Sequence, residues 1–219
     1  IEHTEIKFQI SLKYKVIEEI FQETGDLYFA YTNQSYWQAF NDDISSPFRE
    51  INHEPEFWLQ FNPRQRLGAV KFTAASLGFA HESNGRGGTL SRSWNRVFLN
   101  LVFETGNLAL AIKPWYRLPE DEKTNPGDPH GDDNPNILKY MGHGELTMAY
   151  RTNGNTFSAV WRNNLRSDNR GAIELGWSFP LFRRLKGYVQ YFNGYGESLI
   201  DYDAYSNRIG AGFLLTDWL

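Results

Sequence analysis

Apolar and polar residues alternate with a period of two along most of this chain. From Ile6 to Tyr14, every second residue is apolar, and the residues between them are Lys, Gln and Ser. Successive side chains of a β-strand point to opposite faces, so this run predicts a strand with one apolar face. About eleven such runs follow one another, near 5–14, 26–38, 55–62, 68–83, 93–104, 107–117, 137–152, 155–163, 170–180, 184–195 and 206–216.

The connections between these runs alternate between short and long. Thr105-Gly106-Asn107 is a short turn, whereas 118–136 is a long polar connection. This asymmetry is typical of bacterial outer-membrane barrels. We therefore predict an all-β fold, an antiparallel transmembrane β-barrel, with residues 1–219 forming one domain. Such barrels usually have an even number of strands, so we expect twelve, with one strand upstream of Ile1.

Two features of the pattern allow other interpretations. Residues 15–25 fit either a short helix or a turn between strands. The alternation by itself also fits a soluble β-sandwich or a lipocalin-like barrel. The length and number of the runs, with aromatic residues near their ends, favour the transmembrane barrel.

Composition supports a membrane location and excludes several other classes. Aromatic residues make up 16% of the chain, and side chains with an apolar body and a polar tip are favoured at membrane interfaces. A mean hydropathy of -0.55 does not oppose this, because every second residue of a barrel strand faces a polar interior. The net charge of -4 argues against a nucleic-acid partner. The chain has no cysteine, which excludes disulfides and thiolate chemistry.

The segment 81–96 contains the strongest candidate for catalysis. Ester hydrolysis by a hydroxyl nucleophile needs an imidazole to take its proton and an acceptor to orient that imidazole. His81 and Ser83 are two residues apart, so on a strand they share one face. Asn95 follows on the next predicted strand, where a hairpin can bring it to the same side.

Strand parity places these three polar residues on an apolar face. Counting by twos from His81 and Ser83 leads back to Leu77 and Phe79. Glu82 belongs to the opposite face, where we expect a charge network inside the barrel. If the apolar face meets lipid, the polar residues lie on the outside, where polar groups are costly and usually functional. Counting forward from Asn95 gives Val97, Leu99, Leu101 and Phe103.

The residues HESNGRGGTLSRSWNR at 81–96 closely resemble the signature of the outer-membrane phospholipase A family. Other blocks resemble the same family, appear in its order and extend the resemblance over nearly the whole chain. They are Ser35-Tyr36-Trp37-Gln38, Ser45-Ser46-Pro47-Phe48-Arg49-Glu50, Lys113-Pro114-Trp115-Tyr116, Asp133-Asn134-Pro135, Lys139-Tyr140-Met141-Gly142 and Gly194-Tyr195-Gly196-Glu197-Ser198-Leu199.

The resemblance implies a twelve-stranded barrel in the outer membrane of Gram-negative bacteria. Its activity would be calcium-dependent hydrolysis of acyl ester bonds in membrane phospholipids and lysophospholipids, of the A1/A2 type, activated by formation of a homodimer. By the same resemblance, Ser83 is the nucleophile, His81 the base and Asn95 the orienting group.

The resemblance also implies how the oxyanion and the calcium ion are held. The oxyanion would be bound by the Gly85 backbone N–H together with calcium-bound water. The calcium ligands would be the backbone carbonyls of Arg86 and Ser91 and the Ser45 hydroxyl of a second subunit. Oxygen ligands of this kind suit calcium, and waters complete its shell.

Two residues depart from the family pattern. Gly88 stands where the family commonly has Asp, which argues against a second calcium site here, although Asp133 is retained. Asn33 stands where a glutamine links the subunits in the best-known member, so that hydrogen bond should be shortened or lost.

The remaining polar residues are expected to be structural or solvent-facing. His3, His53, His130 and His143 lack metal-ligand spacing, and the acidic residues from Glu120 to Asp133 fit a solvated external loop better than a metal site. The C-terminal Asp217-Trp218-Leu219 resembles an aromatic segment used in barrel assembly. Two other functions would fit a barrel: a non-enzymatic small porin or structural envelope barrel, and a soluble lipid carrier.

Overall fold

The computed structural model describes residues 4–21, 24–43 and 48–215, and almost all of them lie in strands or their connections. The one α-helix in this part of the chain is α1 (Leu138–Met141), and a short 3-10 turn spans Gly88–Leu90. The strands are β1 (Ile6–Ile17), β2 (Asp26–Trp37), β3 (Phe48–Phe61), β4 (Gln65–Leu67), β5 (Val70–Ser83), β6 (Ser93–Thr105), β7 (Leu108–Arg117), β8 (Gly144–Thr152), β9 (Asn155–Asn163), β10 (Gly171–Pro180), β11 (Lys186–Tyr195) and β12 (Tyr205–Leu214).

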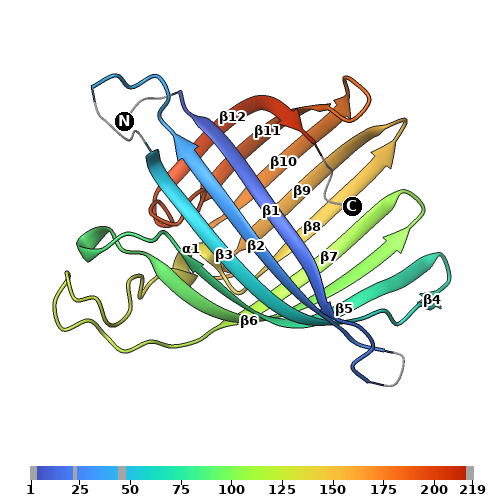
Figure 1. The fold of residues 1–219 in the computed structure, drawn as a ribbon, viewed down its shortest axis with the longest axis horizontal. Coiled ribbons are helices and arrows are strands. Elements are labelled where there is room, and N and C mark those ends of the chain that lie inside the picture. Colours follow the sequence, from blue (N-terminus) through green and yellow to red (C-terminus); the bar gives the residue numbers. More distant parts are fainter. Residues whose placement is uncertain (1–3, 22–23, 44–47, 216–219) are drawn as a thin grey trace.

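The strands form one antiparallel sheet that curls into a near-complete barrel (Figure 1). Each long strand pairs with the next in the order β1-β2-β3-β5-β6-β7-β8-β9-β10-β11-β12, and β4 pairs only with β5. The predicted all-β barrel fold and the eleven long strands are therefore confirmed. The twelfth strand seen here is the three-residue β4, which the sequence pattern did not indicate. Among the described residues, no helix is long and apolar enough to cross a membrane.

Side chains connect the two ends of the sheet, β1 and β12. Arg208 of β12 donates from Nη1 to Glu5 Oε1, just before β1, at 2.5 Å. Lys7 of β1 donates to Gln190 Oε1 of β11 at 3.4 Å. The first contact joins the two ends of the paired path and the second joins β1 to β11, the strand beside β12, so both stabilise the closure of the barrel through side chains.

Two predicted boundaries were wrong, and one choice that the sequence left open is decided. The third strand begins at Phe48 and not near 55, because the chain stays extended through Pro55 and the residues before it pair with β2. The stretch 137–143 contains helix α1 and a turn through Gly142, which has φ +69°, and His143 before β8 begins. Of the two readings of 15–25, the helix is excluded for the described residues, since β1 continues to Ile17.

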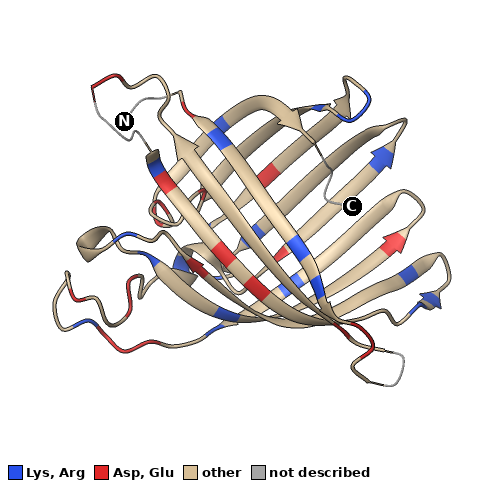
Figure 2. Ribbon diagram, viewed as in Figure 1, with Lys and Arg blue, Asp and Glu red and all other residues tan. Residues whose placement is uncertain are grey.

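The outer surface of the barrel is apolar and its interior carries ion pairs. Ile10 and Leu12 of β1 are mostly exposed, whereas Lys113 of β7 pairs inside with Glu56 of β3 at 2.9 Å. Figure 2 shows how sparsely charges are placed along the strands. Opposite charges inside the barrel satisfy each other, as buried charges require. The alternation in the sequence thus corresponds to an outside and an inside.

A cluster of packed apolar side chains lies inside the barrel near its longer connections. It is a cluster of buried apolar side chains that point inward from strands, from α1 and from the loop 196–204 between β11 and β12. Its members are Ala80, Trp94, Phe98, Trp115, Ile137, Met141, Leu199 and Tyr202, which we call the mouth cluster.

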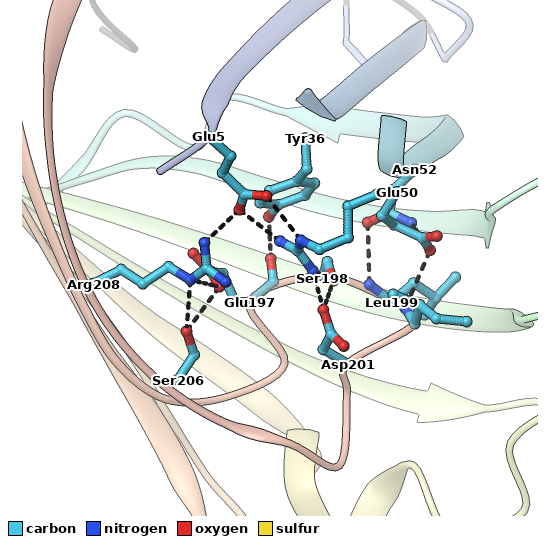
Figure 3. A network of polar contacts seen from close by, with 12 residues as sticks. Glu5, Tyr36, Glu50, Asn52, Glu197, Ser198, Leu199, Asp201, Ser206 and Arg208 are labelled. Atoms are coloured by element: carbon cyan, nitrogen blue, oxygen red, sulfur yellow. Dashed lines mark hydrogen bonds and ion pairs between the residues drawn. The ribbon is translucent and has the colours of Figure 1, made fainter. Parts of the chain in front are cut away.

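Polar contacts attach the loop 196–204 to the barrel wall (Figure 3). The backbone N–H of Leu199 donates to Asn52 Oδ1 at 3.1 Å, and that of Ile200 donates to Glu50 Oε1 at 3.1 Å. Glu50 is fully buried, so these hydrogen bonds form away from water and are correspondingly strong. Arg49 adds a bond to Ser198 Oγ at 3.3 Å from the same strand. The loop is therefore part of the folded interior.

Candidate active site

His81 and Asn95 are direct neighbours on paired strands. They occupy opposing positions in the register of β5 and β6, and His81 Nδ1 lies 2.9 Å from Asn95 Oδ1. An amide oxygen can only accept, so Nδ1 carries the hydrogen and Nε2 is left with its lone pair. This tautomer is the one that a general base requires.

Ser83 is the last residue of β5 and shares the face of His81. Within the part of the chain that the structure describes, its hydroxyl makes no hydrogen bond to the imidazole. Catalytic hydrogen bonds are often long before substrate binds, so this does not argue against the pair. The structure thus brings the three predicted residues together on one face, with the His–Asn contact already formed.

That face is the outside of the barrel. Leu77 is 57% exposed and Val97, two residues beyond Asn95, is also exposed. In contrast, Trp94 and Arg96 are buried in the interior. Glu82 accepts a hydrogen bond from Trp94 Nε1 at 2.9 Å and pairs with Arg96 at 3.2 Å, which confirms the predicted interior charge network.

Asn95 has a second polar partner that the sequence pattern did not reveal. Its amide nitrogen donates to Glu120 Oε1 at 3.2 Å. The backbone N–H of Leu118 also donates to the Asn95 carbonyl at 2.8 Å, which extends the β6–β7 pairing by one step. The sequence held a signal for this contact. In the β6–β7 hairpin Thr105 lies opposite Leu108, and continuing this register along both strands places residue 118 opposite Asn95.

The loop between β5 and β6 is shaped by Asn84. This buried side chain accepts from the backbone N–H of Arg92 at 3.0 Å and donates to the Leu90 carbonyl at 2.9 Å. It also donates to Glu50 Oε2 at 3.4 Å, which connects the loop to the interior wall. Gly85, the next residue, has φ +64°, a conformation that other residues adopt at a cost. The backbone of the predicted oxyanion site is therefore fixed from inside the barrel.

The described residues place two of the three expected calcium ligands on this same loop. No protein donor in the described part of the chain reaches the Arg86 carbonyl, whereas the Ser91 carbonyl accepts a hydrogen bond from Arg92 Nη1 at 2.6 Å. Ser45 lies outside the described residues. The Arg86 guanidinium contacts the backbone carbonyls of Phe48 and Arg49, so the start of β3 adjoins the loop in the same protomer. Carbonyl and hydroxyl oxygens are a donor set that suits calcium.

Asp133 already has partners for both of its carboxylate oxygens. Oδ2 accepts from Ser91 Oγ at 2.7 Å and from Ser93 Oγ at 3.1 Å, and Oδ1 pairs with Lys123. Burial would raise the pKa of this carboxyl, but the hydrogen bonds and the charge of Lys123 outweigh it and lower that pKa. The ammonium group of Lys123 therefore supplies the positive charge beside Asp133 in this structure.

The expectation of a solvated acidic loop was wrong for part of 120–133. The side chains of Asp132 and Asp133 are only 12% and 8% exposed, and Asp132 pairs with Arg117 at 2.5 Å. Arg117 of β7 holds Asp132 against the barrel wall, and Lys123 of the same loop pairs with Asp133. Among the remaining histidines, His130 and His143 are exposed as expected, and His3 lies outside the described residues.

An outward-facing serine, histidine and asparagine on a membrane barrel define a class of proteins, the lipid hydrolases of bacterial outer membranes. The sequence model of the family described as Phospholipase A1 matches residues 1–215, and the chain belongs to this family. It is therefore a phospholipase of the Gram-negative outer membrane.

Individual relatives agree with this assignment. The chain is 39% identical over 213 residues to phospholipase A1 of Escherichia coli K12, with 97% of this chain and 70% of the relative covered. It is 40% identical to a putative phospholipase A1 of Neisseria meningitidis, with 97% and 55% covered. Its structure resembles that of outer membrane phospholipase A from Escherichia coli, with a TM-score of 0.90 and 38% sequence identity. The match covers 98% of this chain and 85% of the Escherichia coli chain. It also resembles the Salmonella typhi outer membrane phospholipase, described as a dimer with bound calcium, with a TM-score of 0.89 and 38% sequence identity. That match covers 97% of this chain and 79% of the Salmonella typhi chain.

Proposed function

We propose that this chain hydrolyses acyl ester bonds of membrane phospholipids with Ser83 as nucleophile, His81 as general base and Asn95 as the residue that orients His81. The observation that carries the proposal is the 2.9 Å contact between His81 and Asn95 on the lipid-facing side, two residues from Ser83. A reactive site on that face can only meet a substrate that is itself in the membrane.

The reaction would proceed in two balanced steps. Ser83 Oγ attacks the ester carbonyl carbon as its proton passes to His81 Nε2, and the carbonyl oxygen takes the negative charge. When the electron pair of the oxyanion re-forms the carbonyl, the bond to the glycerol oxygen breaks and His81 protonates the leaving alkoxide. Water, deprotonated by His81, then attacks the acyl-serine, and collapse of this second intermediate releases the fatty acid and restores the Ser83 hydroxyl.

Asn95 and Gly85 serve these steps without exchanging protons. Asn95 Oδ1 accepts the Nδ1–H of His81 throughout, so Nε2 stays directed at the serine and the imidazolium is stabilised when it forms. The Gly85 N–H donates to the carbonyl oxygen as it becomes negative, and a preorganised donor of this kind is worth about 10²–10³ in rate.

Calcium would be held by the backbone carbonyls of Arg86 and Ser91, with Ser45 of a second copy as a further ligand. When bound, the ion would add positive charge beside the oxyanion. The similar Salmonella typhi structure, a dimer with bound calcium, supports both the metal and the dimer. Sedimentation in detergent should then show that calcium increases the dimer fraction in parallel with activity. Full activity from a monomer, or activity unaffected by a chelator, would contradict this part.

The catalytic assignment is tested by Ser83→Ala and Asn95→Ala. Ser83→Ala should abolish hydrolysis while the barrel still folds, as judged by heat-modifiable gel mobility. Asn95→Ala should be milder, because it removes only the orientation of a base whose full contribution is about 10²–10⁴-fold. Substantial activity in folded Ser83→Ala would refute the nucleophile, and equal inactivity of Asn95→Ala would refute the division of roles.

A further inference from the structure

A row of polar side chains crosses the outer face of the barrel at the level of Ser83. Asn33 of β2 pairs in register with His53 of β3, His53 pairs with Ser83 of β5, and Ser83 pairs with Ser93 of β6. Register neighbours on antiparallel strands share one face and lie about 4.5–5.5 Å apart at Cβ. His53 is thus the side chain directly across from the nucleophile, on the side away from Asn95.

The hydrogen bonds of His53 determine which of its nitrogens carries a hydrogen. Nδ1 lies 2.6 Å from the Tyr31 hydroxyl and 3.3 Å from the Asn33 amide nitrogen. The Ser35 hydroxyl donates to Asn33 Oδ1 at 2.9 Å, which fixes the orientation of that amide. An amide nitrogen only donates, so Nδ1 must accept, and in the neutral imidazole the hydrogen is then on Nε2.

The free edge of the His53 ring faces the oxyanion site. A Cβ placed on Gly85 would lie 3.9 Å from both Cδ2 and Nε2 of His53. Nδ1 is directed toward β2 and Nε2 lies on the other side of the ring, toward β5. The Nε2–H therefore lies beside the Gly85 backbone, on the strand position that pairs with Ser83.

We propose that His53 is a catalytic hydrogen-bond donor whose Nε2–H binds the ester carbonyl oxygen as it becomes negative, alongside the Gly85 N–H. The proposal rests on the assignment of Ser83 as nucleophile. The two imidazoles beside Ser83 then have opposite tautomers and opposite tasks. His81 donates from Nδ1 and accepts a proton at Nε2, whereas His53 accepts at Nδ1 and donates from Nε2. This replaces the expectation that His53 is merely structural.

The proposal is tested with His53→Phe, His53→Gln and, as a matched control, His143→Phe on the exposed surface. The assay is hydrolysis of a phospholipid in detergent micelles with calcium, analysed separately for kcat and KM. Phe keeps the aromatic area and removes the donor, so kcat should fall roughly 10- to 100-fold, since one preorganised oxyanion donor is worth about 10²–10³ in rate and Gly85 remains. Gln retains an N–H and should recover at least part of kcat, and His143→Phe should match the parent enzyme.

Several outcomes would overturn the proposal. They are an unchanged kcat in folded His53→Phe, a change confined to KM, or an equal loss in His53→Gln and His53→Phe. If His53→Phe does not fold, the double variant Tyr31→Phe with Asn33→Leu decides, because it keeps the imidazole and removes the two donors that fix its tautomer. Its kcat should fall by a smaller factor, and an unchanged kcat there would refute the proposal.

Ser83→Ala separates failure of this proposal from failure of the proposed function. An inactive Ser83→Ala beside a fully active His53→Phe rejects only the role of His53. Activity in folded Ser83→Ala rejects the nucleophile and, with it, the role of His53.

Discussion

Asn95 donates from its side-chain amide nitrogen to Glu120 Oε1 at 3.2 Å. The other end of the same amide, Oδ1, faces His81. Because an amide nitrogen can only donate and its oxygen can only accept, a carboxylate on one side forces the oxygen toward the other. Glu120, which lies in a loop outside the strands, therefore fixes the orientation of the Asn95 amide toward His81.

Replacing Glu120 tests this relationship. Glu120→Ala should lower kcat by up to about tenfold with little change in KM, since it removes part of the orientation of a general base. Glu120→Gln keeps an acceptor oxygen and should recover most of the rate. In an Asn95→Ala background, Glu120→Ala should have almost no further effect, because Glu120 acts through Asn95. Additive losses in that double variant would show that Glu120 acts by another route.

Arg92 should oppose calcium binding. Its guanidinium donates to the Ser91 carbonyl at 2.6 Å and to the Thr89 carbonyl at 3.1 Å, so a cation approaching Ser91 meets a positive charge already there. Arg92→Met should lower the calcium concentration for half-maximal activity by about tenfold, or about 1.4 kcal/mol. Arg166→Met, which removes an exposed arginine of another loop, is the control and should leave that concentration unchanged. The same half-saturating calcium for Arg92→Met and the parent would contradict the prediction.

The lipid-facing side of β5 should not tolerate charge. Leu77→Arg should destabilise the inserted barrel by about 2–4 kcal/mol if the residue lies near the bilayer midplane. Leu165→Arg, at an exposed leucine of the loop between β9 and β10, should have almost no effect. Unfolding by denaturant in lipid vesicles measures both. Equal effects of the two variants would mean that Leu77 does not face the hydrocarbon.

Glu5 should make closure of the barrel sensitive to acid. Burial would raise the pKa of its carboxyl, but the hydrogen bond and charge of Arg49, helped by Arg208, outweigh burial and lower that pKa. The lowered pKa means that Glu5 stabilises the fold above its unfolded pKa of about 4.3 and loses this as pH falls through the folded value. Glu5→Gln should lower the midpoint of thermal unfolding at pH 7 and flatten its dependence on pH below about 4.3. If the unfolding midpoint of Glu5→Gln depends on pH below about 4.3 as that of the parent does, other carboxyl groups cause the acid sensitivity.

Sequence periodicity was sufficient for the eleven long strands, though not for all their ends, and for the face that carries His81, Ser83 and Asn95, because both follow from strand parity. The outward position of Leu77 is a consequence of the period of two, and the pairing of His81 with Asn95 adds the register of the β5–β6 hairpin. Contacts between distant segments could not be obtained this way. Glu120 meets Asn95 through the course of a long loop, and the tautomer of His53 depends on two side chains of β2. Pro55 also concealed the first half of β3, since proline is uncommon within strands.

The mouth cluster gives this barrel a distinct electrical property. Trp94, Phe98 and Trp115 pack with Ile137 and Leu199 across the inside of the barrel, at the end where its longer connections lie. An ion on that path would have to leave water for an apolar environment, at a cost far above thermal energy. In a voltage-clamped planar bilayer the inserted protein should therefore pass almost no current, unlike a porin. A steady porin-like conductance would mean that the cluster opens. If no such conductance is found, the applied voltage falls across the folded interior of the protein. The protein is then as good an insulator as the lipid around it.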